Sequence, residues 1–485
     1  MIPPEHLRRH AQHAFTALNP LVLEGLPILS RRNMLKASIA GMAGLTVPRL
    51  LQARAEAAQQ AQSISRKSVI LLWMTGGPSH IDTLDPKPTR PIENRGPFGV
   101  TATKVPGITI CEHLPKLAGM MDRFSILRSV DAMGSNHEPN TVFQTGNPLA
   151  APRVNREGRL YPAIGAMVSK HHGANHPSMP GYAAFMKSSS HLAYAGYLGK
   201  RYDPFIINTA AKLPIYTDVG VDTGSMTNAD LFRMPAGLTM ERIGERQQLL
   251  ASFDQMNRKL DASGTMDVMD YYGQQAVEMI AGRRAQEALD ITREPQAIRD
   301  RYGKHLWCQQ ALLARRLVES GVAFVTLDLS YHGASGTWDT HGDNIPPYGG
   351  IKKGLGPLLP LFDHLVTTLV DDLHQRGLSD EVLVLAMGEF GRSPQTGTQG
   401  STDGRNHWPV VTSALMAGGG LNHGQVIGAT EADGGRIKER PITPGDLAAT
   451  IYRHFDIAQD VTYTDNTGRP RFAVENGTPI RELVG

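Results

Sequence analysis

Four short runs of residues hold most of the side chains in this sequence that could bind a metal ion. They lie at 76–82, 338–343, 388–392 and 404–408, spread over more than three hundred residues. Each run either follows an apolar stretch or sits in a glycine-rich loop. In an α/β protein such segments can meet at one edge of a single sheet. We therefore expect the four runs to converge on one metal site.

Asp339 and His341 are separated by one residue. On an extended segment their side chains point the same way and can share one cation. A divalent metal held there could polarise an ester oxygen and make hydroxide available from bound water. His407, between Asn406 and Trp408 in a loop, is a further candidate ligand. The alternative is a glycine-rich turn with an aspartate cap and an exposed histidine.

Two carboxylates and one histidine complete the set of metal candidates. Glu389 directly follows an apolar run that reads as a buried strand. A carboxylate buried there needs a partner, which is either a metal or Arg392, because a bare buried charge is costly. Asp82 is either a ligand or a turn residue. His80 is either a ligand or a residue that orients one.

The remaining candidates are two arginines that could bind an anion and two cysteines that bear on the type of metal. Arg392 and Arg405 suit a bound phosphate or sulfate, because guanidinium groups grip such oxygens in a bidentate way. Cys111 and Cys308 are the two cysteines of the chain, too few for a cysteine-rich zinc site. We expect zinc, calcium or manganese, held mainly by carboxylates and imidazoles. Whether the two cysteines pair stays open.

The elements that must position these residues alternate along the chain. Apolar runs predict buried strands and amphipathic runs predict helices, and several strands lead straight into a candidate run. This order favours an α/β fold with a doubly wound, mostly parallel sheet and the site on its carboxyl edge. Residues 147–235 read as irregular and 240–280 as helical, which predicts an insertion near 147–300. The predicted strands are 68–74, 125–130, 322–329 and 382–387, and the predicted helical segments are 114–121, 141–145, 309–319 and 358–376.

Five segments together resemble a known family. They are 76–87 (GGPSHIDTLDPK), 337–344 (TWDTHGDN), 388–394 (GEFGRSP), 404–409 (GRNHWP) and 446–450 (DLAAT). They look like a bacterial family of exported, sulfatase-related proteins of unknown function, within the alkaline phosphatase-like superfamily. The resemblance covers residues 66–485. It implies a doubly wound sheet of the alkaline phosphatase and sulfatase type, with helical and loop insertions.

The resemblance also implies a metal site and an activity on phosphate or sulfate esters. It places Asp82 as the ligand after the first strand, Asp339 and His341 as an Asp-x-His ligand pair, and His407 as a late histidine ligand. Glu389 stands where the superfamily usually has an aspartate after a central strand. The implied substrate is a small-molecule or polysaccharide ester.

One departure from that superfamily concerns the nucleophile. Sulfatases have a Cys-x-Pro-Ser-Arg segment that ends in Thr-Gly, whereas this chain has SNHEPN at 135–140 before Thr145 and Gly146. No cysteine is present there to become formylglycine. Counting back from Thr145 gives Asn136, with Ser135 and His137 beside it, as the candidate catalytic group. Metal hydroxide is the alternative nucleophile.

The N-terminal region resembles a twin-arginine export signal. Residues 30–36 read SRRNMLK, followed by a weakly apolar run at 37–47 and by an Ala-x-Ala site at 53–55. We expect 1–57 to be a signal segment, the export machinery to be a partner, and the protein to be periplasmic or secreted. The apolar run is shorter than the ~20 residues that a stable span needs. An amphipathic helix with a chance arginine pair is the alternative.

Composition leaves three classes of function open. A net charge of +3 with 20% charged residues, without a basic cluster interleaved with aromatics, gives no indication of nucleic-acid binding. The first hypothesis is an exported metal-dependent ester hydrolase. The second is an exported binding or structural protein on the same fold without turnover. The third is an exported oxidoreductase that uses a redox metal at the same residues.

Overall fold

The computed structural model divides the chain into two units, Met1–Ser65 and Arg66–Gly485. It describes residues 66–135, 141–151, 154–185, 192–207, 283–330, 337–342, 344, 349–397 and 400–485. The predicted signal segment at 1–57 and the predicted helical stretch at 240–280 lie outside these residues. All of the described residues belong to the second unit.

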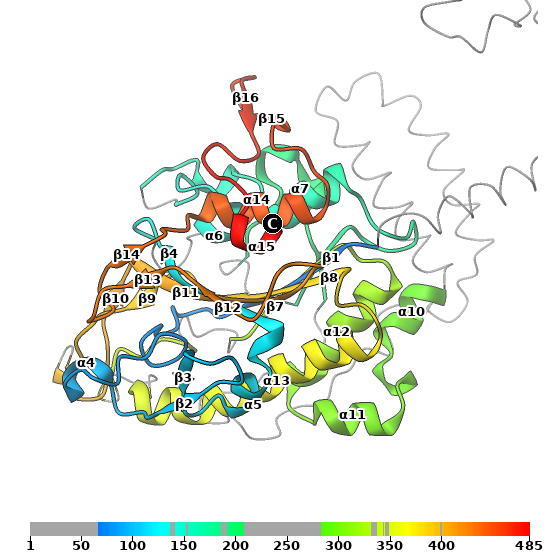
Figure 1. The fold of residues 1–485 in the computed structure, drawn as a ribbon. Helices are drawn as coiled ribbons and strands as arrows, with labels where there is room; N and C mark the ends of the chain where they lie inside the picture. The colour runs from blue at the N-terminus through cyan, green and yellow to red at the C-terminus, as the bar shows by residue number, and fades with distance from the viewer. Residues whose placement is uncertain are drawn as a thin grey trace, which may run out of the picture. The chain divides into compact units, whose positions relative to one another are not determined.

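An eight-stranded mixed sheet forms the centre of this unit (Figure 1). Its strands are β1 (Ser68–Trp73), β4 (Phe124–Asp131), β5 (Tyr182–Phe185), β6 (Phe205–Ile206), β7 (Phe324–Asp328), β8 (Val382–Met387), β11 (Val411–Gly418) and β12 (Gln425–Ile427). Their order across the sheet is β12-β4-β11-β8-β1-β7-β5-β6. Within this sheet β11 pairs antiparallel with β4 and β8, and the other neighbours pair in parallel. The predicted mostly parallel sheet is confirmed.

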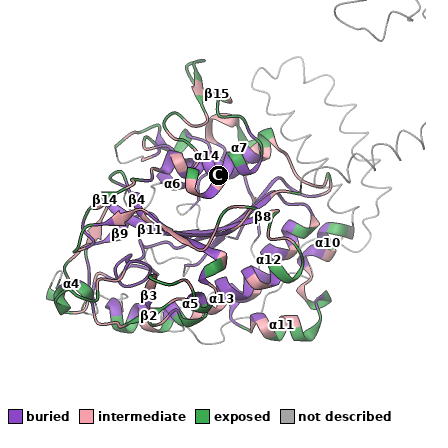
Figure 2. Cartoon of the chain, viewed as in Figure 1, coloured by how far each residue is buried: buried purple, intermediate pink, exposed green. Residues whose placement is uncertain are grey.

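The central strands are apolar throughout because both faces of the sheet are covered. In β1, Ile70 and Leu72 belong to one buried apolar cluster, whereas Val69 and Leu71 belong to another. Successive side chains of a strand point to opposite faces, so the two clusters lie on the two sides of the sheet. Figure 2 shows the sheet as a buried layer between helices that are exposed on their outer sides.

Helices cover the sheet on both sides, as a doubly wound fold requires (Figure 1). One layer contains α5 (Pro115–Gly119), α10 (Arg283–Leu289), α11 (Gln296–Tyr302), α12 (Leu306–Ser320) and α13 (Gly356–Gln375). The other contains α6 (Val142–Thr145), α7 (Ile164–His171), α14 (Pro444–His454) and α15 (Arg481–Val484). The helices predicted at 309–319 and 358–376 are confirmed. Helix α12 ends before Gly321, whose left-handed conformation with φ of 113° suits glycine.

The prediction of irregular structure for 147–235 was wrong at three places in the described residues. Residues 164–171 form α7, and β5 and β6 extend the sheet beyond β7. These strands have only four and two residues, too few to give a periodic pattern in the sequence. The strand β11 was also missed. Its residues Thr412 and Ser413 interrupt the apolar pattern, although both are buried.

The second unit also contains short two-stranded ladders and short helices. Four two-stranded ladders pair β2 with β3, β9 with β10, β13 with β14, and β15 with β16. Their bounds are Val100–Ala102, Thr109–Cys111, Gly391–Arg392, His407–Trp408, Ala429–Thr430, Ile437–Glu439, Thr462–Thr464 and Pro470–Phe472, in the order β2, β3, β9, β10, β13, β14, β15 and β16. The short helices are α4 (Ile92–Arg95), 3-10 turns at Met121–Arg123, Gly158–Leu160, Gly196–Leu198, Lys200–Tyr202 and Ile291–Arg293, and a π-helix at Gly350–Leu355.

Two questions raised by the sequence concern cysteines and membranes. Cys111 and Cys308 are both buried and both free, so they do not form a disulfide. Burial raises the pKa of each thiol to about 12, which makes both thiols poor nucleophiles at neutral pH. In the described ranges, no helix has the length and apolar character needed to cross a membrane.

Candidate metal centre

The candidate site lies where three neighbouring parallel strands end. Strand β1 lies between β7 and β8, and all three run in the same direction. The loops that follow them contain 76–82, 338–342 and 388–392, three of the four predicted runs. A hydrogen bond from the Trp338 N–H to the Thr75 carbonyl, 3.1 Å, joins two of these loops. The carboxyl edge of the sheet therefore gathers these runs as the alternation of elements predicted.

A small antiparallel ladder brings in the fourth run. Strand β10 pairs with β9, and the register sets His407 opposite Arg392. Beside it, the Arg405 N–H donates to the Thr340 carbonyl over 2.7 Å, which joins the fourth run to the loop after β7. These backbone contacts fix where His407 lies. Neither contact has a signature in the sequence, because each joins segments far apart in the chain.

Three of the five predicted ligands form one cluster. In the described part of the chain, Asp339, His341 and His407 each offer a ligand atom, and these atoms all lie within 4.8 Å of one another. The imidazole rings of His341 and His407 are 4.3 Å apart, measured between centroids. Exposure of the side chain rises from 1% for Asp339 to 13% for His341 and 29% for His407. The cluster is thus buried on its aspartate side and open on its histidine side.

The Asp339 carboxylate is oriented by its neighbours. Its Oδ1 accepts hydrogen bonds from the His341 N–H at 3.0 Å and from His341 Nδ1 at 2.5 Å, and it lies 2.8 Å from Arg392 Nη1. We place the proton of His341 on Nδ1, because a bare nitrogen lone pair would repel the carboxylate at this distance. In the neutral ring, Nε2 then has the lone pair that a metal needs.

Arg392 holds the aspartate rather than facing a pocket. Its side chain is fully buried. Besides Asp339 it donates to the carbonyls of Gly76, Gly77 at 2.9 Å and Arg405 at 3.2 Å. The backbone N–H of Arg392 also lies 3.4 Å from His80 Nδ1, and His80 Nε2 donates to a backbone carbonyl over 2.7 Å. Burial lowers the pKa of His80, so this ring is neutral and its Nδ1 can accept the Arg392 backbone N–H.

Glu389 is not among the three residues of the cluster. Its Oε1 accepts a hydrogen bond of 2.8 Å from the Gly76 N–H, and only 5% of the residue is exposed. Gly76 has φ of 120°, and a Cβ there would stand 2.6 Å from the Asp339 nitrogen. Only glycine allows the two loops to approach so closely. Arg392, which the sequence offered as an alternative partner for Glu389, forms its ion pair with Asp339.

Asp82 and Arg405 form a separate pair. Arg405 Nε lies 2.6 Å from Asp82 Oδ2 and Arg405 Nη2 lies 3.1 Å from Oδ1, so the contact is bidentate. The Ser79 hydroxyl donates to the same carboxylate, and Arg405 donates to the carbonyls of Ser393, Pro394 and Asn94. Both side chains are fully buried. The structure therefore does not bring Asp82 to the cluster, and it directs the Arg405 guanidinium into the protein.

One acidic residue at this edge was missed by the sequence reasoning. Asp328 is the last residue of β7 and is fully buried. Its oxygens accept hydrogen bonds from the Thr75 hydroxyl at 3.1 Å and from the Ser330 hydroxyl at 2.7 Å. The signal was present, because an acidic residue ends an apolar strand here just as Glu389 follows β8.

The three predicted catalytic residues are only partly described. Ser135 is 2% exposed, and the preceding Gly134 N–H donates to the Pro409 carbonyl over 3.0 Å. This contact places Ser135 near the loop that follows His407. Asn136 and His137 lie outside the described residues. The nucleophile therefore stays a prediction.

Comparison with solved structures finds matches of low identity. The i-CgsB protein in complex with k-i-k-neocarrahexaose is 10% identical, with a TM-score of 0.40, and the match covers 85% of this chain and 74% of that chain. The PsFucS1 sulfatase from Pseudoalteromonas sp. is 13% identical, with a TM-score of 0.34 and coverage of 86% and 73%. The phosphonate monoester hydrolase SpPMH from Silicibacter pomeroyi is 11% identical, with a TM-score of 0.35 and coverage of 86% and 76%.

The fold of this chain is defined by its own strand order and helical layers. No curated protein matches the sequence. One family model does match, and it covers residues 66–484, which include every candidate residue discussed above. On that match, the chain belongs to the DUF1501 family, described as proteins of unknown function.

Proposed function

We propose that this protein is an exported metal-dependent hydrolase of phosphate or sulfate esters. The observation that supports the proposal best is the cluster of Asp339, His341 and His407, with ligand atoms within 4.8 Å of one another at the carboxyl edge of the central strands. Three protein ligands that leave further coordination positions open are typical of catalytic rather than structural metal sites. Export rests on the segment at 30–55, which the structure does not describe.

The donor set fits a transition metal. One carboxylate and two imidazoles suit zinc or manganese, whereas calcium prefers oxygen ligands. Asp339 Oδ2 and His407 Nε2 are 3.8 Å apart. Two ligands that share one tetrahedral zinc at ~2.1 Å stand roughly 3.4 Å apart, so a small closure would complete the site. We therefore favour zinc or manganese among the metals that the sequence left open.

The residues of the chain have distinct tasks in this proposal. Arg392 and the Nδ1–H of His341 hold Oδ1 of Asp339, which orients Oδ2 toward the metal position. The same contact presents His341 Nε2 as a ligand. A bound divalent cation would act as a Lewis acid and lower the pKa of a bound water to about 7. Ser135, if it reaches the site, would be an alternative nucleophile.

The test compares ester hydrolysis by metal-loaded protein and by three variants. The substrates are p-nitrophenyl phosphate, p-nitrophenyl sulfate and bis-p-nitrophenyl phosphate. We expect turnover by the zinc- or manganese-loaded protein, and its loss in Asp339→Ala and His407→Ala. His374→Ala, an exposed histidine in α13, is the matched control and should retain activity. Turnover that survives Asp339→Ala would contradict the proposal.

A second candidate is a non-catalytic binding protein on the same fold. The segment at 135–140 lacks the cysteine that a sulfatase would oxidise, which favours this candidate. It predicts a folded protein that binds metal at the cluster and shows no metal-stimulated turnover of any of the three esters. The same assay therefore separates the two candidates.

A further inference from the structure

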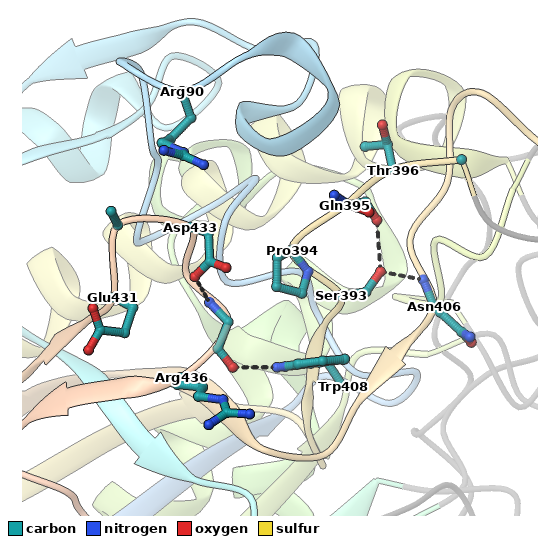
Figure 3. Close-up of a pocket in the computed structure, with 13 residues that line it drawn as sticks. Arg90, Ser393, Pro394, Gln395, Thr396, Asn406, Trp408, Glu431, Asp433 and Arg436 are labelled. Atoms are coloured by element: carbon teal, nitrogen blue, oxygen red, sulfur yellow. Dashed lines mark hydrogen bonds between the residues drawn. The ribbon is translucent and has the colours of Figure 1, made fainter.

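A pocket of about 840 Å³ lies beside the candidate metal centre, outside the cluster itself. Three parts of the chain form its walls (Figure 3). They are Arg90, the loop at 393–397 together with Asn406 and Trp408, and the loop at 431–436. Asn406 and Trp408 flank His407, yet His407 does not line the pocket. Neighbouring residues of a strand point to opposite faces. The pocket and the cluster therefore lie on opposite faces of β10.

The wall at 431–436 is held in place by three side chains. Consecutive carbonyls of this loop accept hydrogen bonds, at Asp433 from Asn94 over 2.8 Å, at Gly434 from His80 over 2.7 Å, and at Gly435 from Trp408 over 2.6 Å. Asn94 also donates to the Pro394 carbonyl over 2.7 Å, so it joins two walls. A loop pinned in this way keeps the pocket open without a ligand.

Charged groups of both signs face the pocket and balance one another. They are Arg90, Arg436, Glu431 and Asp433. In the described part of the chain none of the four takes part in an ion pair. Arg90 donates from Nε to Asn94, and Asp433 accepts from the Gly435 N–H at 2.8 Å. Most of their hydrogen-bonding capacity is thus available to a ligand.

This balance excludes several kinds of ligand. Two carboxylates would repel a polyanion such as a nucleic acid, and two guanidinium groups would repel a polycation. An apolar ligand would desolvate four charges without replacing their hydrogen bonds. What fits is a ligand with many groups that both donate and accept hydrogen bonds. The amides of Gln395 and Asn406, which also line the pocket, have the same dual character.

Trp408 adds an aromatic surface that is fixed in orientation. Its indole N–H donates to the Gly435 carbonyl (Figure 3), and the residue is partly exposed. A ring held in this way loses little rotamer freedom when a ligand stacks on it. The C–H face of a sugar ring stacks on such a surface while its hydroxyls bond to planar polar side chains.

We propose that this pocket binds a neutral or amino-containing saccharide. The inference concerns binding alone and does not require the metal centre to hydrolyse an ester. The two sites are connected, because His80 contacts both the pocket loop and Arg392, and Trp408 follows His407 in β10. A saccharide in the pocket would therefore rest against the strand that positions His407.

The test is binding to an array of immobilised oligosaccharides with neutral, amino-containing, sulfated and carboxylated members, followed by calorimetry with the best soluble oligosaccharide. A zwitterionic tripeptide serves as a competing probe. We expect binding to neutral or amino-containing members. Glu431→Gln and Arg436→Ala, both at exposed positions, and Trp408→Ala should each weaken it about tenfold.

His374→Ala is the matched control, because this exposed histidine of α13 lies outside the pocket lining. Its saccharide affinity should equal that of the wild type, whether or not the protein hydrolyses esters. Thermal unfolding of each variant checks that it is folded. The proposal is overturned if no oligosaccharide binds, if only acidic ones bind, if the tripeptide binds more tightly, or if the three pocket variants bind as the wild type does.

Discussion

Two buried pairs of arginine and aspartate, both drawn from the predicted runs, differ in what they leave for chemistry. Arg405 grips both oxygens of Asp82. Arg392 contacts one oxygen of Asp339, and the other lies 3.8 Å from His407 Nε2. All four side chains are almost fully buried. The residue types are the same in both pairs. Both oxygens of Asp82 are bonded to Arg405, whereas Arg392 orients Asp339 toward His341 and His407.

The difference shows that burial of a charged pair does not by itself mark a functional site. The Asp82–Arg405 pair connects the loop after β1 to the loop at 393–406 and satisfies every group it buries. The Asp339–Arg392 pair orients a donor set whose histidines reach the surface. We assign the first pair to the architecture and the second to the metal centre.

The largest expected effect is on stability, at the architectural pair. Arg405→Ala leaves Asp82 buried without its cation, which should lower the free energy of unfolding by about 3–5 kcal/mol. Denaturant unfolding measures this. The double variant Asp82→Leu, Arg405→Met removes both charges and should recover part of the loss, because the carbonyls of Ser393, Pro394 and Asn94 still lose their donor. A loss below about 1 kcal/mol in Arg405→Ala would show that the pair is not architectural.

The second effect is on metal affinity, at the most exposed ligand. His407→Ala should weaken zinc binding by more than about 100-fold, because removing a ligand costs more than removing a residue that orients one. The unfolding free energy of the metal-free protein should change by less than about 1 kcal/mol. Competition with a chelator measures the affinity. An unchanged affinity would exclude His407 from the ligand set.

A smaller effect is expected where Arg392 orients Asp339. Arg392→Lys keeps the charge but cannot reproduce the fork of contacts to Asp339, Gly76 and Gly77. Zinc affinity should fall about 10–100-fold while the metal-to-protein ratio at saturation stays the same. The matched variant Arg436→Lys, in the pocket wall, should bind zinc as the wild type does. Equal affinities in both variants would remove Arg392 from the metal centre.

The smallest effect separates a structural histidine from the cluster histidines. Burial lowers the pKa of His454 from 6.5 to about 4, and its Nε2 contacts the Ser68 carbonyl over 3.1 Å. As pH falls below 6.5 the unfolded chain takes up a proton that the folded protein refuses until about pH 4. The contribution of neutral His454 to the free energy of unfolding is therefore fully present above pH 6.5. It should fall by about 2 kcal/mol from pH 7 to pH 5.

His454→Gln removes the titrating group and keeps a donor for Ser68. Unfolding by denaturant at pH 7 and pH 5 should show a smaller difference between the two pH values for this variant than for the wild type. Equal differences would mean that His454 is not held neutral by burial.

Three of the candidate ligands lie together for physical reasons. Asp339 and His341 are two residues apart, and a turn in which Asp339 Oδ1 accepts the His341 N–H holds their side chains together. His407 was placed by its motif, and β9–β10 pairing explains why it meets them. Asp82 was considered as a ligand because nothing local shows that Arg405, 323 positions away, occupies its carboxylate. Long-range pairs of this kind cannot be derived from spacing.

For the fold as well, features that depend on local sequence were predicted, and features that depend on distant pairing were missed. Strands β1, β7 and β8 were predicted because burial on both faces demands continuous apolar runs. Strands β5 and β6 have only four and two residues and join the sheet by pairing with β7 and with each other, so no periodic pattern in the sequence marks them. Sequence therefore located the strands that position the cluster and missed those that widen the sheet.

The most direct test of the account is elemental analysis of the purified protein, beside the double variant Asp339→Ala, His341→Ala. The account predicts about one equivalent of zinc or manganese in the wild type and none in the folded double variant, with His374→Ala retaining its metal. Metal absent from the wild type after reconstitution with either ion, or equally present in the double variant, would contradict a metal centre at Asp339, His341 and His407.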